Sequence, residues 1–360
     1  LRRIITGIGD KNGIETEAGF DITPASEIMA IMCFATSVDD LRRRIDNILL
    51  GITEDDKPFT VKDMGVGGSI VALLLDALKP NLVQTTEGTP AFVHCGPFAN
   101  IAHGCNSVMA TAAALEYGDY AITEAGFGAD LGAEKFYNIK CRKTGLQPDL
   151  TVLVVTLQAL KMHGGIAQED IKKPNVAGME AGYWNLDKHV KNLQSFGQTV
   201  VIAFNKFATD TDEEIEVLRK HCEEMGCGFA VNSAFAEGGK GAMELAELVV
   251  KTIDEHPSAP LYFTYDDDEP VEKKIEDVAF NLYGAGSVTL SDSAKSMIEE
   301  IKKLGAEKFP ICIAKTQYSF STDAKAYGPT EGFALHVRDI TVNMGAEMIV
   351  VIAGEITGLS

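Results

Sequence analysis

Short apolar runs alternate along the chain with segments whose apolar residues recur at helical spacing. This alternation predicts an α/β fold in which a mostly parallel sheet is covered by helices on both faces. Strands are expected at residues 82–83, 120–123, 150–156, 199–204 and 229–231, and helices at 105–117, 131–142, 178–196, 212–225 and 242–255.

The two ends of the chain add further elements. Near the N-terminus, Thr23 is predicted to cap a helix that has Pro24 at its first position. Helices are also expected at 39–50, 68–78, 270–283 and 291–304. After Pro310 the chain becomes rich in strand-like runs, at 311–314, 333–337, 340–342 and 348–352.

Three stretches rich in glycine and polar residues follow strand-like runs: Gln84–Gly104, Glu124–Phe136 and Thr156–Gly165. In an open α/β sheet, ligands bind beyond the carboxyl ends of the strands, so these loops are expected to converge on one site. Glycines in the second loop let the backbone approach a ligand closely. The basic side chains His94, His103, Lys161 and His163 indicate that the ligand is an anion.

Composition limits the classes of partner. The net charge of −20 argues against binding a nucleic-acid backbone, so an anionic substrate needs a local basic pocket. No apolar run reaches the roughly 18 residues of a membrane helix. The seven cysteines lack CxxC spacing, which is typical of reduced thiols in a cytoplasmic protein.

An Asn-Lys pair, Asn205–Lys206, follows a buried strand and is followed by helix, strand and the loop 232–241. GTPase-type P-loop nucleotide hydrolases have an NKxD motif and a later Ser-Ala loop in this order. Phe207 and Phe235 lie where two rings could enclose a flat heterocycle, with a gain in stacking and burial energy. The pattern leaves open the alternative that both phenylalanines are core residues.

Longer motifs are similar to one family. Residues 20–31 (FDITPASEIMAI), 90–107, 123–136 and 159–165 (ALKMHGG), with the later FNKFATDT and AKTQYSFS segments, resemble formate–tetrahydrofolate ligase, and the resemblance extends over essentially the whole chain. It implies a two-step reaction. ATP phosphorylates formate to formyl phosphate, and N10 of tetrahydrofolate then attacks the formyl carbon and releases phosphate.

The resemblance also implies an architecture and a set of site residues. The fold is expected to be P-loop-NTPase-like, with a large domain at 1–188, a second α/β domain at 189–310 and a small β-rich domain at 311–360. The expected catalytic residues are His94, His103, Gly132, Lys161 and His163. The expected folate- or purine-binding residues are Asn205, Lys206, Phe207, Thr209, Asp210, Ser233, Ala234, Phe235, Gly238 and Gly239.

The implied cofactors are ATP with Mg²⁺ and a monovalent cation, K⁺ or NH₄⁺, with tetrahydrofolate and formate as substrates and a homotetramer as the assembly. No metal ligands are assigned. Asp130 and Glu134 could hold Mg²⁺ through water, orient a base, or serve as caps and ion pairs, and the sequence does not decide between these roles.

The chain departs from the family pattern in several places. It contains no GxxxxGK[ST] motif, which the family carries upstream, and it stops where the family continues through a Pro-rich segment. We therefore expect a fragment that is inactive alone. Gln158 replaces a usual Arg, and Phe235 a common Trp. A GTPase-like protein and a non-catalytic folate- or purine-binding module are the alternatives.

Overall fold

The computed structural model describes residues 3–19, 22–98 and 101–354, and divides the chain into two compact units. Unit 1 comprises Leu1–Gly126, Leu290–Lys315 and Val337–Ser360, and unit 2 comprises Phe127–Thr289 and Thr316–His336. Two of the predicted motifs include residues outside the described ranges: residues 20–21 of the motif 20–31, and residues 99–100 of the motif 90–107. Residues 355–360 of the predicted C-terminal domain also lie outside the described ranges. The structure is a mixed α/β protein, as predicted.

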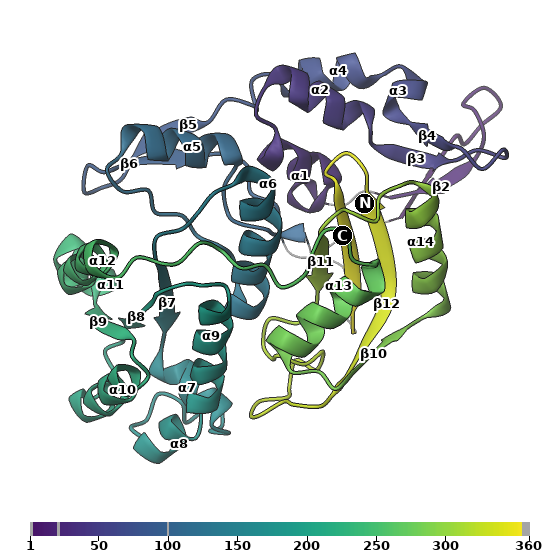
Figure 1. Cartoon of the computed structure of the whole chain (residues 1–360). Coiled ribbons are helices and arrows are strands. Elements are labelled where there is room, and N and C mark those ends of the chain that lie inside the picture. Colours follow the sequence, from purple (N-terminus) through teal and green to yellow (C-terminus); the bar gives the residue numbers. More distant parts are fainter. Residues whose placement is uncertain (1–2, 20–21, 99–100, 355–360) are drawn as a thin grey trace. The chain divides into compact units, whose positions relative to one another are not determined.

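Unit 2 is organised around a parallel three-stranded sheet in the order β7-β8-β9 (Figure 1). The strands are β7 (Thr151–Val155), β8 (Val200–Asn205) and β9 (Gly228–Asn232). Residues 200–204 of β8 are all buried, which suits an apolar run in the central strand of a covered parallel sheet. The predicted strands at 150–156, 199–204 and 229–231 are confirmed.

Helices of unit 2 pack against this sheet, among them α9 (Tyr183–Ser195), α10 (Asp212–Glu224) and α12 (Met243–Glu255). The predicted helix at 178–196 is instead two helices, α8 (Val176–Glu180) and α9. The break lies at Gly182, where a Cβ would be only 2.0 Å from the carbonyl oxygen of Leu160. The remaining helices are α6 (Arg142–Thr144), α7 (Leu157–His163), α11 (Ala234–Glu237) and α13 (Val271–Val278).

The predicted helix at 131–142 is present but differs in type. It consists of two π-helical turns, Gly128–Ala133 and Phe136–Cys141, that lead into α6. A third π-helical turn, Ala279–Tyr283, extends α13, and a 3-10 turn at Gly238–Ala242 precedes α12. π-helical turns are rare and often occur at functional sites, so the first of them is a candidate part of such a site.

A four-stranded sheet has the order β10-β12-β13-β11, with β10 (Ser287–Leu290), β11 (Ile311–Ala314), β12 (Ala334–Asn343) and β13 (Met348–Ala353). Unit 1 includes β11, β13 and residues 337–343 of β12, whereas residues 287–289 of β10 and 334–336 of β12 belong to unit 2. The two strands predicted at 333–337 and 340–342 are one strand, with an irregularity in register between Val337 and Asp339. These strands pack with the N-terminal part, because the Glu27 carboxylate accepts hydrogen bonds from the N–H groups of Gly345 (2.7 Å) and Ala346 (3.3 Å).

The helices of unit 1 are α1 (Glu27–Phe34), α2 (Val38–Asp46), α3 (Val61–Met64), α4 (Gly67–Leu74), α5 (Val108–Tyr117) and α14 (Asp292–Lys303). Ser26, not Thr23, caps α1, because Thr23–Ala25 forms a separate 3-10 turn. The predicted helix at 39–50 ends at Asp46 and is followed by a strand.

Three antiparallel hairpins complete unit 1: β1 (Ile4–Thr6) with β2 (Thr16–Ala18), β3 (Leu49–Ile52) with β4 (Pro58–Thr60), and β5 (Asn81–Gln84) with β6 (Pro90–Val93). The run 82–83 therefore belongs to a hairpin and not to a parallel sheet. No strand forms at 120–123, so that prediction is wrong. Across the described residues, no helix has the length and apolar character needed to cross a membrane.

Candidate functional site

The carboxyl ends of β8 and β9 carry the predicted folate- or purine-binding residues. Because the strands are parallel neighbours, Asn205 and Asn232 lie opposite each other. The Asn232 side-chain amide donates to Asn205 Oδ1 at 2.8 Å, and the Lys206 backbone N–H donates to the Asn232 carbonyl at 3.0 Å. These bonds join the two loops at their bases. Sequence reasoning missed Asn232, although an asparagine at the end of both strands was visible in the sequence.

A tight turn follows Asn205. The Asp210 carboxylate accepts from the Phe207 backbone N–H at 2.8 Å, and the Asp210 N–H donates to the Phe207 carbonyl at 3.1 Å. Lys206 Nζ lies 3.4 Å from Asp212 Oδ1. Thr209 is exposed on the same turn. Asp210 therefore holds the loop in shape, and burial raises the pKa of its carboxyl.

The loop after β9 is closed on itself. The Ser233 N–H donates to the Gly241 carbonyl at 3.0 Å, and the Ser233 hydroxyl donates to Glu237. The Asn232 side chain accepts from the Ala234 N–H at 3.2 Å. Gly238 and Gly239 lie within this closed loop, and Gly238 has a positive φ of 61° that favours glycine.

Gly241 is the position at which this closure tolerates no side chain. A Cβ would be 2.5 Å from the Ser233 carbonyl carbon and 2.6 Å from its oxygen, and both are backbone atoms. We expect Gly241→Ala to lower the free energy of unfolding by about 1–3 kcal/mol, the usual cost of overpacking, as measured by urea denaturation. Gly51→Ala is the matched control, since a Cβ at Gly51 would have no neighbouring atom within 4 Å. Equal stability of the two variants would contradict a tight closure.

Phe207 and Phe235 are both exposed, at 44% and 103% of the reference surface. The alternative that they are core residues is therefore wrong. Large aromatic side chains on neighbouring loops leave apolar surface in water, which a flat ligand could cover. Both rings belong to unit 2.

The third predicted loop begins at the carboxyl end of β7, where the Thr156 hydroxyl caps α7 by accepting from the Ala159 N–H at 3.1 Å. Lys161 lies in α7 and is buried. Its Nζ lies 2.6 Å from Glu214 Oε1 and donates to the Lys173 carbonyl at 2.8 Å. The ammonium group is thus bound by protein groups, and Glu214 was not predicted because it lies far away in the sequence.

His163, at the end of α7, lies in an aromatic environment. Its ring makes edge contacts with Trp184 and Tyr327, with centroids 5.9 Å apart in each case. Burial lowers the pKa of His163, and nearby Asp130 opposes that effect. Nδ1 is buried and has no hydrogen-bond partner among the residues described. His163 therefore suits a neutral hydrogen-bonding role better than that of a cation.

The second predicted loop forms the π-helical turn Gly128–Ala133. The N–H of Gly132, one of the expected catalytic residues, donates to the Phe127 carbonyl at 3.2 Å. Glu134 follows directly and is 1% exposed, with Oε1 accepting from the Asn138 side chain at 2.8 Å. Burial raises the pKa of Glu134 to about 7. This effect outweighs the Asn138 hydrogen bond and the charges of Lys135 and Arg142, which lower the pKa.

His94, in the first loop, is buried and both of its ring nitrogens are hydrogen-bonded. Nδ1 lies 2.6 Å from the Ser107 hydroxyl, and Nε2 lies 2.8 Å from the Ala77 carbonyl. Since a carbonyl only accepts, Nε2 carries the hydrogen. Ser107 Oγ accepts from the Ala110 N–H, so its own hydrogen is directed to Nδ1. His94 thus ties the loop to the N-terminus of α5, and would have to release a bond to contact an anion.

His103 is also buried, at 0% exposure. Its Nδ1 donates to the Ile101 carbonyl at 2.9 Å, and its ring stacks on Phe34 of α1 with centroids 4.3 Å apart. The N–H of Cys105, directly after the first loop, donates to the carbonyl of Glu124, the first residue of the second loop, at 3.0 Å. Both imidazoles thus contact residues of unit 1.

The predicted catalytic residues are divided between the units. His94 and His103 belong to unit 1, whereas Gly132, Lys161 and His163 belong to unit 2 with all the predicted folate- or purine-binding residues. Within unit 2, the loops after β7, β8 and β9 start from one edge of one parallel sheet, as the sequence predicts. The first predicted loop follows a strand of an antiparallel hairpin, and the second predicted loop follows no strand. The expectation that all three predicted loops follow strands of one parallel sheet is therefore wrong for the first and second loops.

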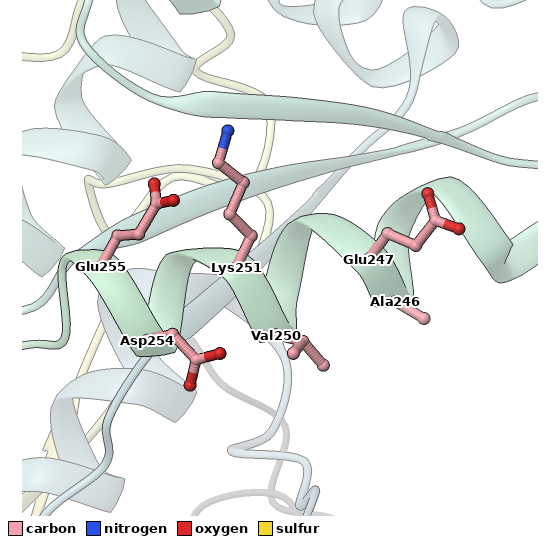
Figure 2. A pocket seen from close by; sticks show the side chains of 6 residues that line it. All are labelled: Ala246, Glu247, Val250, Lys251, Asp254 and Glu255. Carbon is pink, nitrogen blue, oxygen red and sulfur yellow. The ribbon is translucent and has the colours of Figure 1, made fainter.

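A shallow hollow on α12 lies outside these loops (Figure 2). Figure 2 shows that all of its lining side chains come from that one helix: Ala246, Glu247, Val250, Lys251, Asp254 and Glu255. None of them was predicted to act in the site.

The described residues include no group of three or more His, Cys, Asp or Glu side chains placed to hold a metal ion. Mg²⁺ bound with a nucleotide needs only one or two carboxylates, because phosphates and water supply the other ligands. Burial raises the pKa of the Glu134 carboxyl to about 7, which favours its protonated form. We assign no magnesium ligand.

Comparison with known proteins gives a consistent result. The family model described as formate–tetrahydrofolate ligase matches residues 1–360. The chain is 66% identical over 357 residues to the formate–tetrahydrofolate ligase of Bacteroides fragilis, 65% to that of Bacteroides thetaiotaomicron and 63% to that of Parabacteroides distasonis. Each comparison covers 99% of this chain and 64% of the relative. The chain thus spans slightly less than two thirds of the length of these relatives.

Proposed function

Because the chain belongs to the formate–tetrahydrofolate ligase family, we propose that it takes part in the ATP-dependent ligation of formate to tetrahydrofolate. The products are 10-formyltetrahydrofolate, ADP and phosphate, and formyl phosphate is the intermediate. The observation that carries this proposal is the match along all 360 residues, together with 66% identity to a named ligase. The substrates are formate, ATP and tetrahydrofolate.

Phe207 and Phe235 are proposed to bind the pterin or purine ring. Their exposure on loops from adjacent strand ends supports this role. The hydrogen bond between Asn205 and Asn232, and the closure of the loop after β9 at Gly241, fix the bases of the loops after β8 and β9 before a ligand arrives. Such preorganisation lowers the entropic cost of binding. Lys206, Thr209, Asp210, Ser233, Ala234, Gly238 and Gly239 complete the proposed pocket wall.

For the acyl-phosphate, the proposed residues are His94, His103, Gly132, Lys161 and His163. His163 is proposed to act as a neutral hydrogen-bonding group, because burial lowers its pKa. Lys161 holds α7 to the N-terminus of α10, and contact with a phosphate would require its pair with Glu214 to open. Bound Mg²⁺ would neutralise nucleotide phosphates, and the proposal extends to a monovalent cation, K⁺ or NH₄⁺.

The proposal also includes the finer architecture: a P-loop-NTPase-like sheet, domains at 1–188, 189–310 and 311–360, and a homotetramer. The parallel order β7-β8-β9 supports the first of these. A cytoplasmic location is supported by the seven cysteines, which are present as thiols and not as disulfides.

Isothermal titration calorimetry of the chain with tetrahydrofolate, ATP and GTP tests the proposal. We expect tetrahydrofolate to bind. A preference for GTP without folate binding would favour a GTPase-like protein and overturn the ligase proposal. If a full-length protein that includes this chain binds tetrahydrofolate but forms no 10-formyl product, the result would favour the non-catalytic binding module over the ligase.

Phe207→Ala is expected to weaken tetrahydrofolate binding by about 1–3 kcal/mol, because a stacked aromatic partner is lost. The dissociation constant from the same titration measures this effect. Phe59→Ala is the control, since Phe59 is 37% exposed but lies in a hairpin of unit 1. An unchanged dissociation constant in Phe207→Ala would remove Phe207 from the pocket.

A further inference from the structure

A long connection joins two strands of the four-stranded sheet. It extends from the end of β11 at Ala314 to the start of β12 at Ala334, and its residues, all of which the structure describes, form no helix or strand. From Thr316 onward it belongs to unit 2. Loops of this length usually have a function of their own. The AKTQYSFS motif lies at the start of this connection, and the proposed pocket gives it no role.

Aromatic side chains attach the connection to helices of unit 2. Phe320 is 2% exposed, and its ring centroid lies 6.0 Å from that of Trp184 and 4.5 Å from that of His189, both on α9. Further along the connection, the Tyr327 ring meets the His163 ring edge-on, with centroids 5.9 Å apart. Phe320 is thus a buried anchor, whereas Tyr327 is 45% exposed and lies at the surface.

The backbone around Tyr327 allows this side chain to move. Gly328 follows it with a φ of 103°, and Gly332 has a φ of 72°, both in the region that glycine adopts without strain. The Gly332 N–H donates to the Gly284 carbonyl at 2.8 Å, which fixes the far end of the connection. Tyr327 can therefore turn aside while the anchors at Phe320 and Gly332 stay in place.

Two ring nitrogens beside these aromatic residues are buried. Nδ1 of His163 and Nε1 of Trp184 have no hydrogen-bond partner among the described residues. The two rings are in edge contact, with centroids 5.9 Å apart. An unpaired buried polar group destabilises the folded state, and native proteins usually supply its partner. The indole N–H can only donate, so its partner must offer an acceptor atom.

We propose that His163 and Trp184 form a subsite for a small carboxylate, which enters when Tyr327 turns aside. A carboxylate has two acceptor oxygens, enough for the indole N–H and for the Nδ1–H tautomer of His163. The rings of Phe320 and Tyr327 exclude water, which strengthens hydrogen bonds to a bound anion. All four residues belong to unit 2. The choice of formate as the carboxylate rests on the proposed function.

Charge and size set the expected affinity. Asp130 is 4% exposed on the neighbouring π-helical turn, and its charge acts on His163, so it opposes a second negative charge nearby. The two N–H donors have to offset this repulsion. A ligand as small as formate makes few contacts, so we expect a dissociation constant of about 1 mM or weaker.

Tryptophan fluorescence tests the subsite directly, because Trp184 is the only tryptophan in the chain. The 360-residue chain is titrated with sodium formate in place of sodium chloride at constant ionic strength. We expect a saturable change in fluorescence. Acetate should bind several-fold more weakly, because its methyl group needs space between packed rings. A linear response to formate, or tighter binding of acetate than of formate, would overturn the proposal.

Variants of the two rings test the donors. Trp184→Phe keeps an aromatic ring but removes the N–H, and His163→Leu removes both nitrogens. Each should weaken formate binding several-fold, as measured by saturation-transfer NMR of the formate proton. His163→Asn keeps a donor near the position of Nδ1 and should bind formate more tightly than His163→Leu. Unchanged formate affinity in a Trp184→Phe protein that retains its circular dichroism would refute the subsite.

The role of Tyr327 is tested against a second tyrosine on the same connection. Tyr327 and Tyr318 are 45% and 53% exposed, but the ring in contact with His163 is that of Tyr327. Tyr327→Ala should increase the quenching of Trp184 fluorescence by acrylamide several-fold, whereas Tyr318→Ala should leave it unchanged. Equal quenching in the two variants would show that Tyr327 does not close the subsite.

The result can be separated from the test of the ligase proposal. If tetrahydrofolate binds but formate leaves Trp184 fluorescence unchanged, the subsite is wrong and the ligase proposal stands. If formate binds at Trp184 but tetrahydrofolate does not bind, the subsite stands and the ligase proposal is weakened.

Discussion

Lys161→Met is expected to lower the free energy of unfolding by about 3–5 kcal/mol, the usual cost of removing one partner of a buried ion pair. Lys161 and Glu214 are each 1% exposed, and Lys161 Nζ lies 2.6 Å from Glu214 Oε1. Methionine keeps the length of the side chain but leaves the Glu214 charge without its cation. Urea denaturation at constant pH measures the loss.

The Glu214 carboxylate explains why the effect should be large. Its Oε1 also accepts from the Asn175 N–H at 2.8 Å, and its Oε2 accepts from the Thr211 hydroxyl at 2.8 Å in the capping box of α10. Although burial raises the pKa of Glu214, the Lys161 pair and these bonds lower it overall. The pair therefore connects α7, the segment before α8 and the start of α10.

Lys173→Met is the matched control. Lys173 Nζ also lies 2.6 Å from a carboxylate, that of Asp170, but the two side chains are 73% and 47% exposed. Exposed pairs contribute about 0–1 kcal/mol, so this variant should lose little. The double variant Lys161→Met, Glu214→Gln should recover part of the loss, because no buried charge remains. Equal losses in the two single variants would show that burial does not strengthen the pair.

The contrast between Lys161 and Lys173 shows where sequence reasoning fails. The local sequence ALKMHGG does not indicate that Lys161 pairs with the carboxylate of Glu214, 53 positions away in the sequence. Its type and loop predicted an anion-binding role, and the fold gives it an internal partner. Whether the pair opens to a phosphate stays a prediction. Long-range partners of this kind are decided by tertiary packing, which a single sequence does not encode in its spacing.

The strands of unit 2 were predictable for a physical reason. Residues 200–204 form an unbroken apolar run, which a central parallel strand needs on both faces. The run 82–83 gave no such information, because two apolar residues fit a hairpin equally well. The signal lay in the turn after it, where Thr85 and Thr89 pair and Gly88 has a φ of 87°. That turn chemistry predicts a hairpin.

Glu134→Gln is expected to remove a pH dependence of stability worth about 3 kcal/mol, from the difference between a folded pKa of about 7 and the ordinary 4.5. Burial is the main cause of the raised pKa. The folded chain therefore holds the Glu134 proton more tightly than the unfolded chain does. The resulting contribution is complete below pH 4.5, and is lost as the pH rises through about 7.

Glutamine resembles the protonated carboxyl, because it cannot ionise and its oxygen can still accept from Asn138. Its amide hydrogens also take the place of Oε2, which has no hydrogen-bond partner among the described residues. The variant should match the unmodified chain near pH 4 and be more stable near pH 8. Urea denaturation of both proteins across this range gives the difference, in which other titrating groups cancel.

Glu247→Gln provides the control, since Glu247 lies exposed on α12 (Figure 2) and should give a curve parallel to that of the unmodified chain. Parallel curves for Glu134→Gln would instead mean that Glu134 is ionised in the folded protein, with its charge held by Lys135 or Arg142. The measurement thus decides which state of Glu134 the π-helical loop carries at neutral pH. A neutral carboxyl donates a hydrogen bond to an anion, whereas an ionised one repels it, so the answer fixes what this loop can bind.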